Sequence, residues 1–359
     1  MCSSDLALSK LDDHAEALNG YQKAINLAPE RAEFWQGRGS ELSAIGNYNE
    51  SLASFDRAIK LNPGLYVAWY ERGNSLCALT RYEYAVSNYE KALATNPAFA
   101  AAHQGRGFAL LQQGHYLKAI ESFDRSLTID PKSYITWCQR GDALWQIDRH
   151  EDALHSYRAA IGVDGDQQIA WYSEANALRC LQEFDLALSS YNRALTISPT
   201  DARCWNERGL VLLGKGQLPE AIDSYRRATN LQPEYPEAWQ NLAAALADNN
   251  DVEESLDCYR EAIAHQPQNA KSWYGVGELL LKNKRWSDAV TSYQRATQIE
   301  PDFSLAWYGQ GLALAGMQQW LPAMKCYDRA ARLLPDNYDL FLDYGAACSQ
   351  MERWPEAFW

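Results

Sequence analysis

Histidine is the residue whose chemistry most often serves catalysis or metal binding, and two of the six histidines of this chain lie close together. His150 and His155 flank Glu151 and Asp152, a set of side chains that could bind a metal ion. The two histidines are five residues apart, however, which is a poor spacing for two ligands on one face of a helix. The favoured interpretation is the solvated beginning of a helix, because charged side chains of this kind are mostly exposed.

The eight cysteines are the other group of reactive side chains. No two are separated by only two residues, and their gaps follow neither a zinc-site nor a disulfide-module spacing. We therefore expect small hydrophobic side chains, buried or half-buried, in a reducing compartment. The sequence also contains no His-Glu-x-x-His motif, no Gly-rich phosphate-binding loop and no nucleophile elbow. These features predict a chain that is not an enzyme and that binds no metal or cofactor.

The charge balance limits the kind of partner. The chain has 33 Lys and Arg residues against 46 Asp and Glu residues, a net charge of −13. A nucleic-acid binder needs a basic stripe to neutralise phosphates, so nucleic acid is not an expected ligand. No apolar run reaches the roughly 18 residues of a membrane span. The N-terminal residues lack a signal-peptide pattern, so the expected location is the cytoplasm.

The elements that carry these residues follow an internal repeat of 34 residues. With Ala32 as position 1 of the frame, nine complete units follow one another without an insertion or deletion. The predicted units are residues 32–65, 66–99, 100–133, 134–167, 168–201, 202–235, 236–269, 270–303 and 304–337. Residues 1–31 contain the end of an earlier unit, and residues 338–359 begin another. We therefore expect the sequence to be a fragment of a longer reading frame, truncated at both ends.

Several frame positions hold one kind of residue. Position 4 is Trp in eight of the nine units and His103 in the other, and position 24 is always aromatic. Gly or Ala at position 8 would let two helices approach closely, which offsets the helix-propensity cost of glycine, about 1 kcal/mol. Apolar residues later in each unit follow helical spacing, as in Ala85, Tyr89 and Ala92. Pro at position 32, replaced only by Gly165, would end the second helix.

This pattern resembles the tetratricopeptide repeat family, whose motif of Trp, Leu-Gly, Tyr, Ala, aromatic, Ala and Pro is met nearly position for position over essentially the whole chain. The resemblance implies an all-α fold, a right-handed α-solenoid superhelix of antiparallel helix pairs. One departure is position 7, usually Leu in the family, which is Arg38, Arg72, Arg106, Arg140 or Arg208 here. The stem of such an arginine could pack while its head reaches solvent or a carboxylate. The Trp-x-x-Arg-Gly pattern is similar to that of bacterial members, cyanobacterial ones in particular.

In this family the first helices of successive units line a concave groove, and positions 2, 5, 9, 12 and 13 face it. The resemblance therefore implies a protein or peptide ligand in that groove. The candidate partner-binding residues at these positions are Val67, Tyr70, Asn74, Phe108, Leu111, Ile135, Trp145, Ile169, Tyr172, Asn176, Tyr274 and Tyr308. Aromatic anchors with apolar neighbours are typical of a surface that holds a peptide. Alternatively, these side chains partly pack on one another.

Two binding signatures of the family are missing. Members that bind a chaperone tail hold its terminal carboxylate with Lys, Asn and Arg at set positions. Two of these positions match here, at Asn241 and Lys271, whereas Asn206, Leu210 and Gly275 occupy others. The nucleocytoplasmic glycosyltransferases carry Asn at position 6 of successive units, which this chain has only once. The sequence therefore predicts no carboxylate clamp and does not identify the partner.

Two hypotheses for function remain. The leading one is a protein-interaction scaffold that holds an extended or helical segment in the groove. The alternative is the targeting or regulatory region of a larger enzyme, such as a glycosyltransferase, kinase or protease, whose catalytic domain lies outside these residues.

Overall fold

The computed structural model describes residues 3–350, with side chains from Asp13 onward, and every regular element in this range is a helix. The predicted all-α architecture is confirmed. The chain divides into two compact units, Met1–Glu183 and Phe184–Trp359. The division falls inside the predicted repeat unit 168–201. The C-terminal residues 351–359, where the sequence predicts the start of a further helix, lie outside the described range.

The helices recur at regular intervals. The first compact unit contains α1 (Ser3–Leu27), α2 (Ala32–Ala44), α3 (Tyr48–Leu61), α4 (Tyr66–Ala78), α5 (Tyr82–Thr95), α6 (Ala100–Gln112), α7 (Tyr116–Ile129), α8 (Tyr134–Trp145), α9 (His150–Val163) and α10 (Gln168–Cys180). The second contains α11 (Phe184–Ile197), α12 (Ala202–Gly214), α13 (Leu218–Leu231), α14 (Pro236–Asp248), α15 (Val252–His265), α16 (Ala270–Lys282), α17 (Trp286–Ile299), α18 (Ser304–Gly316), α19 (Trp320–Leu333) and α20 (Tyr338–Gln350). From α2 onward, each even-numbered helix begins 34 residues after the one before it.

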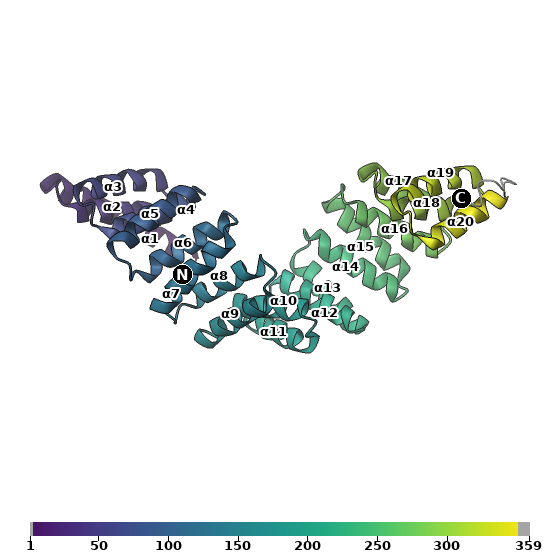
Figure 1. Ribbon diagram of the computed structural model, residues 1–359, viewed down its shortest axis with the longest axis horizontal. Coiled ribbons are helices and arrows are strands. Elements are labelled where there is room, and N and C mark those ends of the chain that lie inside the picture. Colours follow the sequence, from purple (N-terminus) through teal and green to yellow (C-terminus); the bar gives the residue numbers. More distant parts are fainter. Residues whose placement is uncertain (1–2, 351–359) are drawn as a thin grey trace. The chain divides into compact units, whose positions relative to one another are not determined.

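The helices of each compact unit pack as antiparallel pairs (Figure 1). In the first unit α2 pairs with α3, α4 with α5, α6 with α7, and α8 with α9. The second unit repeats this arrangement from α12 to α19. The even-numbered helices also contact one another in succession, as α6 contacts α8 and α8 contacts α10. Each unit therefore has a continuous row of even-numbered helices, on which any elongated ligand could meet several helices at once.

The aromatic ring at frame position 24 is the centre of each helix pair. Phe123 of α7 has no exposed surface, and its ring lies against the backbone of α6 at Gly107. A Cβ atom added to Gly107 would lie 2.6 Å from Cε1 of that ring, well inside the normal contact distance between two carbon atoms. The same close approach occurs between Gly73 and Tyr89, and it recurs in most of the nine repeat units. The ring therefore favours a residue without a Cβ atom at position 8, where seven of the nine repeat units have Gly, and the two exceptions, Ala175 and Ala243, have the smallest side chain.

The residue at position 4 joins each even-numbered helix to the turn that precedes it. The indole Nε1 of Trp69 donates a hydrogen bond to the carbonyl oxygen of Pro63 at 3.0 Å. The equivalent bond is made by Trp35, Trp137, Trp171, Trp205, Trp239, Trp273 and Trp307. His103, the exception in the sequence, makes it through Nε2 to the carbonyl oxygen of Pro97 at 2.9 Å. A ring N–H donor is thus what all nine units share at this position.

Arginine at position 7 links neighbouring helix pairs. Arg140 of α8 donates through Nε to Asp124 of α7 at 2.6 Å, and through Nη1 to Ser156 of α9 at 2.7 Å. Arg72 and Arg208 likewise each donate one hydrogen bond to the preceding helix pair and one to the second helix of their own pair. The expectation that these arginine heads reach a carboxylate is confirmed for Arg72 and Arg140.

The charges of this link are exchanged between α9 and α10. Here position 7 is the buried Glu174, and its carboxylate accepts from Nε of Arg158 at 2.9 Å. Arg158 stands at position 25, where Asp124 stands one unit earlier. The ion pair therefore keeps its place while the acid and the base change helices.

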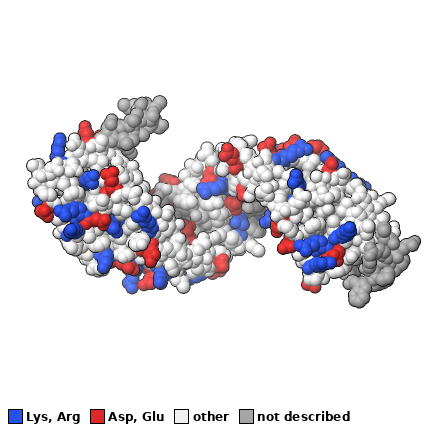
Figure 2. Space-filling model, turned by 90° about the horizontal axis from the view of Figure 1, so that it is seen from above, with Lys and Arg blue, Asp and Glu red and all other residues white. Residues whose placement is uncertain are grey.

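Charges elsewhere on the surface are mixed. On the face seen in Figure 2, Lys and Arg side chains lie interspersed with Asp and Glu over both compact units. In the helices of residues 3–350, none combines the length and the apolar composition that crossing a bilayer requires.

Substituting the same residue at two glycines tests the packing against the ring. We expect Gly107→Val to destabilise the chain by about 2–3 kcal/mol, because its side chain would overlap the ring of Phe123. Gly162→Val is the matched control, since a Cβ there meets no atom within 4 Å, and it should change the stability by less than about 0.5 kcal/mol. Thermal unfolding followed by circular dichroism measures both effects. Equal melting temperatures for the two variants would contradict the assigned role of position 8.

Exchanging the charges of one ion pair tests the link between helix pairs. Glu174→Arg alone would face Arg158 and should destabilise the chain by about 1–3 kcal/mol. The double variant Arg158→Asp/Glu174→Arg reproduces the arrangement of Asp124 and Arg140, so most of the lost stability should return. Urea unfolding of the two single variants and the double variant gives the coupling energy, and purely additive effects would argue against the link.

Candidate functional site

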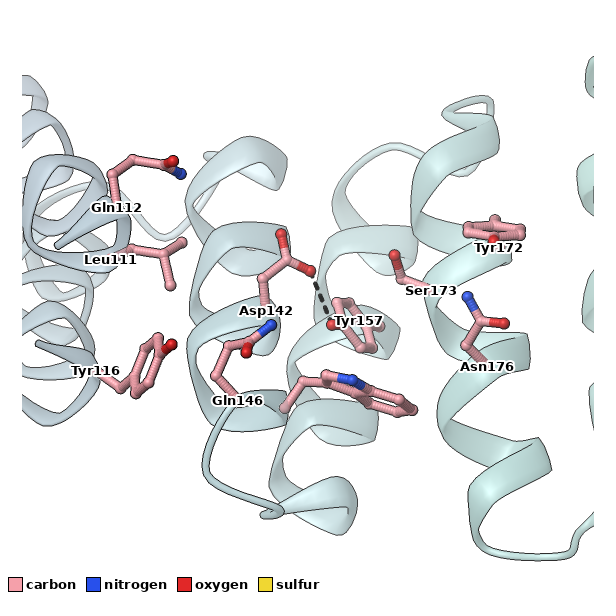
Figure 3. Close-up of a pocket in the computed structure, with 10 residues that line it drawn as sticks. Leu111, Gln112, Tyr116, Asp142, Gln146, Tyr157, Tyr172, Ser173 and Asn176 are labelled. Carbon is pink, nitrogen blue, oxygen red and sulfur yellow. Dashed lines mark hydrogen bonds between the residues drawn. The ribbon is translucent and has the colours of Figure 1, made fainter. Parts of the chain in front are cut away.

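A pocket of about 550 Å³ opens on the row of even-numbered helices in the first compact unit. The residues that line it come from α6, α8 and α10, with one residue each from α7 and α9 (Figure 3). They are Leu111, Gln112, Tyr116, Asp142, Trp145, Gln146, Tyr157, Tyr172, Ser173 and Asn176. We call this site the α8 pocket, because α8 lies between the other two even-numbered helices that form it.

The repeat frame explains how α8 places its side chains in the pocket. Asp142 and Trp145 stand at positions 9 and 12, three residues apart, so they lie on the same face of α8 one turn from each other. Gln146 directly follows the last residue of α8. The Trp145 ring packs against the ring of His150, the first residue of α9, with 4.6 Å between the centroids. The indole therefore packs against the beginning of α9.

Asp142 has a hydrogen-bond partner inside its own helix pair. The hydroxyl of Tyr157, the position-24 aromatic residue, donates to Oδ1 of Asp142 at 2.9 Å. Asp142 is exposed at the surface, yet the side chains around it remove much of its water. This desolvation raises the pKa of the Asp142 carboxyl, and the hydrogen bond from Tyr157 lowers it by less.

The same hydroxyl contact occurs with other acceptors. Tyr89 donates to Oδ1 of Asn74 at 2.8 Å, and Tyr293 donates to the carboxylate of Glu278. Position 9 can therefore hold a neutral amide or a carboxylate opposite the same tyrosine. The choice between them sets the charge of this surface and leaves the packing unchanged.

Comparison with known families assigns the chain. A family model described as tetratricopeptide repeat matches residues 70–134, 138–202 and 241–303, more than half of the chain. Two further models, described as TPR repeat and tetratricopeptide repeat, match residues 209–250 and 32–65. The chain belongs to the tetratricopeptide repeat family. The family predicted from the sequence is thereby confirmed.

Several solved structures are similar to this tetratricopeptide repeat (TPR) chain. The Cut9 and Hcn1 hetero-tetramer of the APC/C is 13% identical over 95% of this chain and 82% of the other, with a TM-score of 0.53, and this likeness supports an α-solenoid. YrrB, described as a TPR protein with an unusual peptide-binding site, is 21% identical over 55% of this chain and 99% of its own, with a TM-score of 0.46. MamA is 22% identical over 46% and 96%, with a TM-score of 0.44. Among curated proteins, none matches the chain.

The α8 pocket of this TPR protein contains four of the residues predicted from the sequence. Leu111, Trp145, Tyr172 and Asn176 come from three predicted repeat units and line one cavity. Their common origin is position 5, 9 or 12 of the frame. Lining a cavity is not in itself binding, so their role stays a prediction.

The other predicted residues lie on the even-numbered helices outside this pocket. On α4, Tyr70 packs edge-on against Phe99 with 4.9 Å between ring centroids, and Asn74 accepts the hydroxyl of Tyr89. Val67 is half-buried. Tyr70 therefore fits the alternative interpretation, in which the candidate residues partly pack on neighbouring side chains.

On α6, α8 and α10 the remaining three candidates differ in exposure. Phe108 packs edge-on against Tyr82, with 6.4 Å between the ring centroids. Ile135 and Ile169 are exposed, with 48% and 46% of their surfaces open to solvent. Exposed isoleucines on neighbouring helices are available to a ligand without any rearrangement.

In the second compact unit, both predicted tyrosines contact other side chains. Tyr274 of α16 lies against Phe303, with 5.0 Å between ring centroids. Tyr308 of α18 donates its hydroxyl to Asp343 of α20 at 2.6 Å. Each contact reaches beyond the tyrosine's own helix, so both tyrosines have a structural role there.

Sequence reasoning did not select six residues of the α8 pocket. Gln112 and Gln146 stand at position 13, which the family assigns to the groove, so the frame could have identified them. Asp142 stands at position 9 and was equally visible. Ser173 at position 6, Tyr116 at the start of α7 and Tyr157 at position 24 lie at positions that carry no groove signal. Their contribution depends on the packing of α7, α9 and α10 around α8.

The histidines singled out by the sequence lie apart in the structure. The His150 ring packs against Trp145 with the two planes tilted by 55°, whereas His155 lines a different hollow with Trp137 and Arg140. Across the described range, no cluster of three or more His, Cys, Asp or Glu side chains could hold a metal ion.

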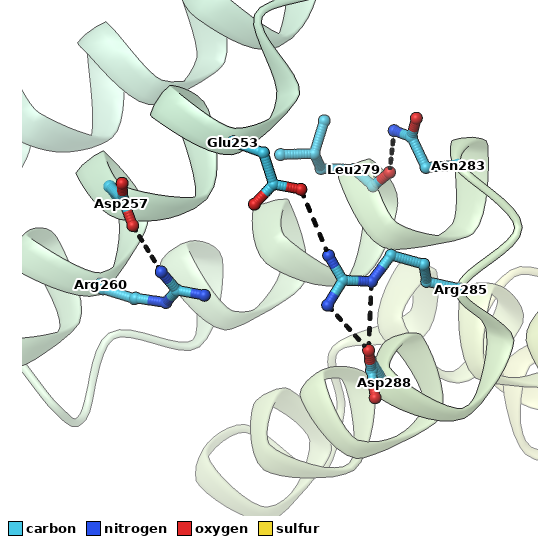
Figure 4. A network of polar contacts seen from close by, with 7 residues as sticks. All are labelled: Glu253, Asp257, Arg260, Leu279, Asn283, Arg285 and Asp288. Atoms are coloured by element: carbon cyan, nitrogen blue, oxygen red, sulfur yellow. Dashed lines mark hydrogen bonds and ion pairs between the residues drawn. The ribbon is translucent and has the colours of Figure 1, made fainter.

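A second cavity, of about 510 Å³, lies among α15, α16 and α17. Its wall is apolar and includes Val276, which stands at position 7 where five units have arginine. The rim carries Arg260 and Arg285. Figure 4 shows both guanidinium groups bonded to carboxylates, Arg260 to Asp257, and Arg285 to Asp288 at 3.0 Å. The charges at this rim are thus compensated within the protein, unlike the charge of Asp142.

The raised pKa of Asp142 makes a prediction about stability. A carboxyl whose pKa is raised by folding destabilises the folded chain at pH values above that pKa, and this cost disappears below the pKa of the unfolded chain. We therefore expect Asp142→Asn to raise the melting temperature at pH 7 and to leave it unchanged near pH 3, about one unit below an ordinary carboxyl pKa.

Thermal unfolding of wild type and variant at both pH values checks this expectation. Asp124→Asn is the contrasting variant, because Asp124 pairs with Arg140 and its loss should lower the melting temperature at pH 7. A decrease at pH 7 for Asp142→Asn would show that its carboxylate stabilises the fold.

Proposed function

We propose that this chain is a protein-interaction scaffold that binds an extended segment of a partner protein along its even-numbered helices, with the α8 pocket as the main anchor site. The predicted repeat units 100–133, 134–167 and 168–201 each contribute one of the helices that meet at this pocket. Because the lining residues come from three neighbouring even-numbered helices, a ligand of this pocket must contact all three, and an extended peptide can do so.

The composition of the pocket is the observation that carries this proposal. Aromatic and apolar side chains, Tyr116, Trp145 and Leu111, provide area that a ligand could bury. The amides of Gln112 and Gln146 have both donors and acceptors, which suit the backbone of an extended peptide. A volume of about 550 Å³ is suited to one or two side chains of such a peptide.

Family membership supports the same proposal. TPR units form an α-solenoid whose even-numbered helices present a long surface in place of a closed active site. YrrB, whose peptide-binding site is described as unusual, is built from the same kind of repeat.

Removing one anchor tests the site. A random peptide library displayed on phage would be selected on the full chain, and the affinities of the selected peptides measured by fluorescence anisotropy. We expect Trp145→Ala to weaken binding by tenfold or more, about the effect of removing an aromatic hot spot.

Leu117→Ala is the matched control, because Leu117 of α7 is 69% exposed and lies outside the α8 pocket. It should leave the affinities unchanged. If the selected peptides bind both variants as tightly as wild type, the α8 pocket is not the anchor site.

A further inference from the structure

Asp142 is the one charged side chain among the residues that line the α8 pocket. Its Oδ1 atom is occupied by the Tyr157 hydroxyl. In the part of the chain that the structure describes, no Lys, Arg or His side chain forms an ion pair with it. The carboxylate therefore enters the pocket with its negative charge uncompensated.

Polar and aromatic side chains lie on both sides of Asp142 in the pocket. Figure 3 shows Gln112 and Tyr116 on one side of Asp142, and Ser173, Asn176 and Tyr172 on the other. Gln146 lies beside it on the same helix end. The side-chain oxygens of these amides accept hydrogen bonds, and so they can share an N–H donor with the carboxylate.

An uncompensated carboxylate that has lost water is unfavourable unless a cation approaches it. A cationic side chain would supply that charge, and its aliphatic stem could pack against Leu111 and Trp145. The electron-rich faces of Trp145 and Tyr116 attract a cation as well. An anionic side chain would meet repulsion from Asp142, and no group of the pocket offsets that repulsion.

We propose that the α8 pocket selects a lysine or arginine side chain of the bound segment, with the charged head on the free oxygen of Asp142 and the stem against Trp145. This inference rests on the proposed function and adds to it the chemistry of the partner. The ligand is thus a basic peptide segment.

The chain itself contains a neutral version of this site. Asn74 accepts the hydroxyl of Tyr89 in the same way as Asp142 accepts that of Tyr157, at 2.8 and 2.9 Å. Asp142→Asn therefore reproduces an arrangement that already folds in α4 and α5, and it removes the charge alone. Glu278 in α16 also accepts a tyrosine hydroxyl but lies in the other compact unit, so Glu278→Gln is the matched control.

The test uses the full chain and peptide pools whose central residue is lysine, arginine, norleucine or glutamate between randomised positions. We expect the wild type to bind the lysine and arginine pools about tenfold more tightly than the norleucine pool, and the glutamate pool most weakly. Asp142→Asn should lower the affinity for the lysine and arginine pools to that for the norleucine pool. Glu278→Gln should keep the preference.

The outcomes separate this inference from the proposed function. Binding of all pools without a preference for a cation would overturn the inference and leave the scaffold function standing. A preference that survives Asp142→Asn would place the cation elsewhere and also overturn it. If no pool binds in any form of the chain, the proposed function fails and the inference fails with it.

Discussion

The contact between the position-24 ring and the backbone at position 8 determines most of this structure. Phe123 approaches Gly107 so closely that a Cβ atom at Gly107 would lie 2.6 Å from the ring, so this contact sets how closely the two helices of the pair approach. In three of the repeat units the same contact carries a tyrosine hydroxyl to position 9 on the neighbouring helix, as Tyr157 reaches Asp142. A core contact therefore also fixes the orientation of a side chain on the surface where a ligand would bind.

The chain builds different surfaces on this constant core by varying a few positions. Asn74, Asp142 and Glu278 receive the same kind of hydroxyl, yet they give their helices different charges. The link at position 7 shows the same freedom, because Arg158 and Glu174 exchange the charges of an otherwise repeated ion pair. Since the ring and the Trp hydrogen bond maintain the packing, such changes can alter binding without altering the fold.

The sequence was sufficient to predict the helices, and it predicted the binding surface only in part. The period of 34 residues and the aromatic, glycine and proline positions locate each helix, because each of these residues acts on its own backbone or on a partner at a constant spacing. The α8 pocket also includes Tyr116 and Ser173, which carry no groove signal. Conversely, Tyr70 and Tyr308 fit the groove pattern, but each also contacts a neighbouring side chain, Phe99 and Asp343 respectively.

Local spacing alone therefore determined the all-α fold, the repeat frame and the family of this protein, since all three depend on residues whose partners lie at the same separation in every unit. The tertiary structure decided which groove residues share a pocket and which charge in that pocket is uncompensated. Both depend on side chains from α6 to α10 that meet only after three units have packed together. Asp142 looks like any other acidic residue in the sequence, and only the packing of α6 to α10 places it in a pocket whose lining residues include no Lys, Arg or His.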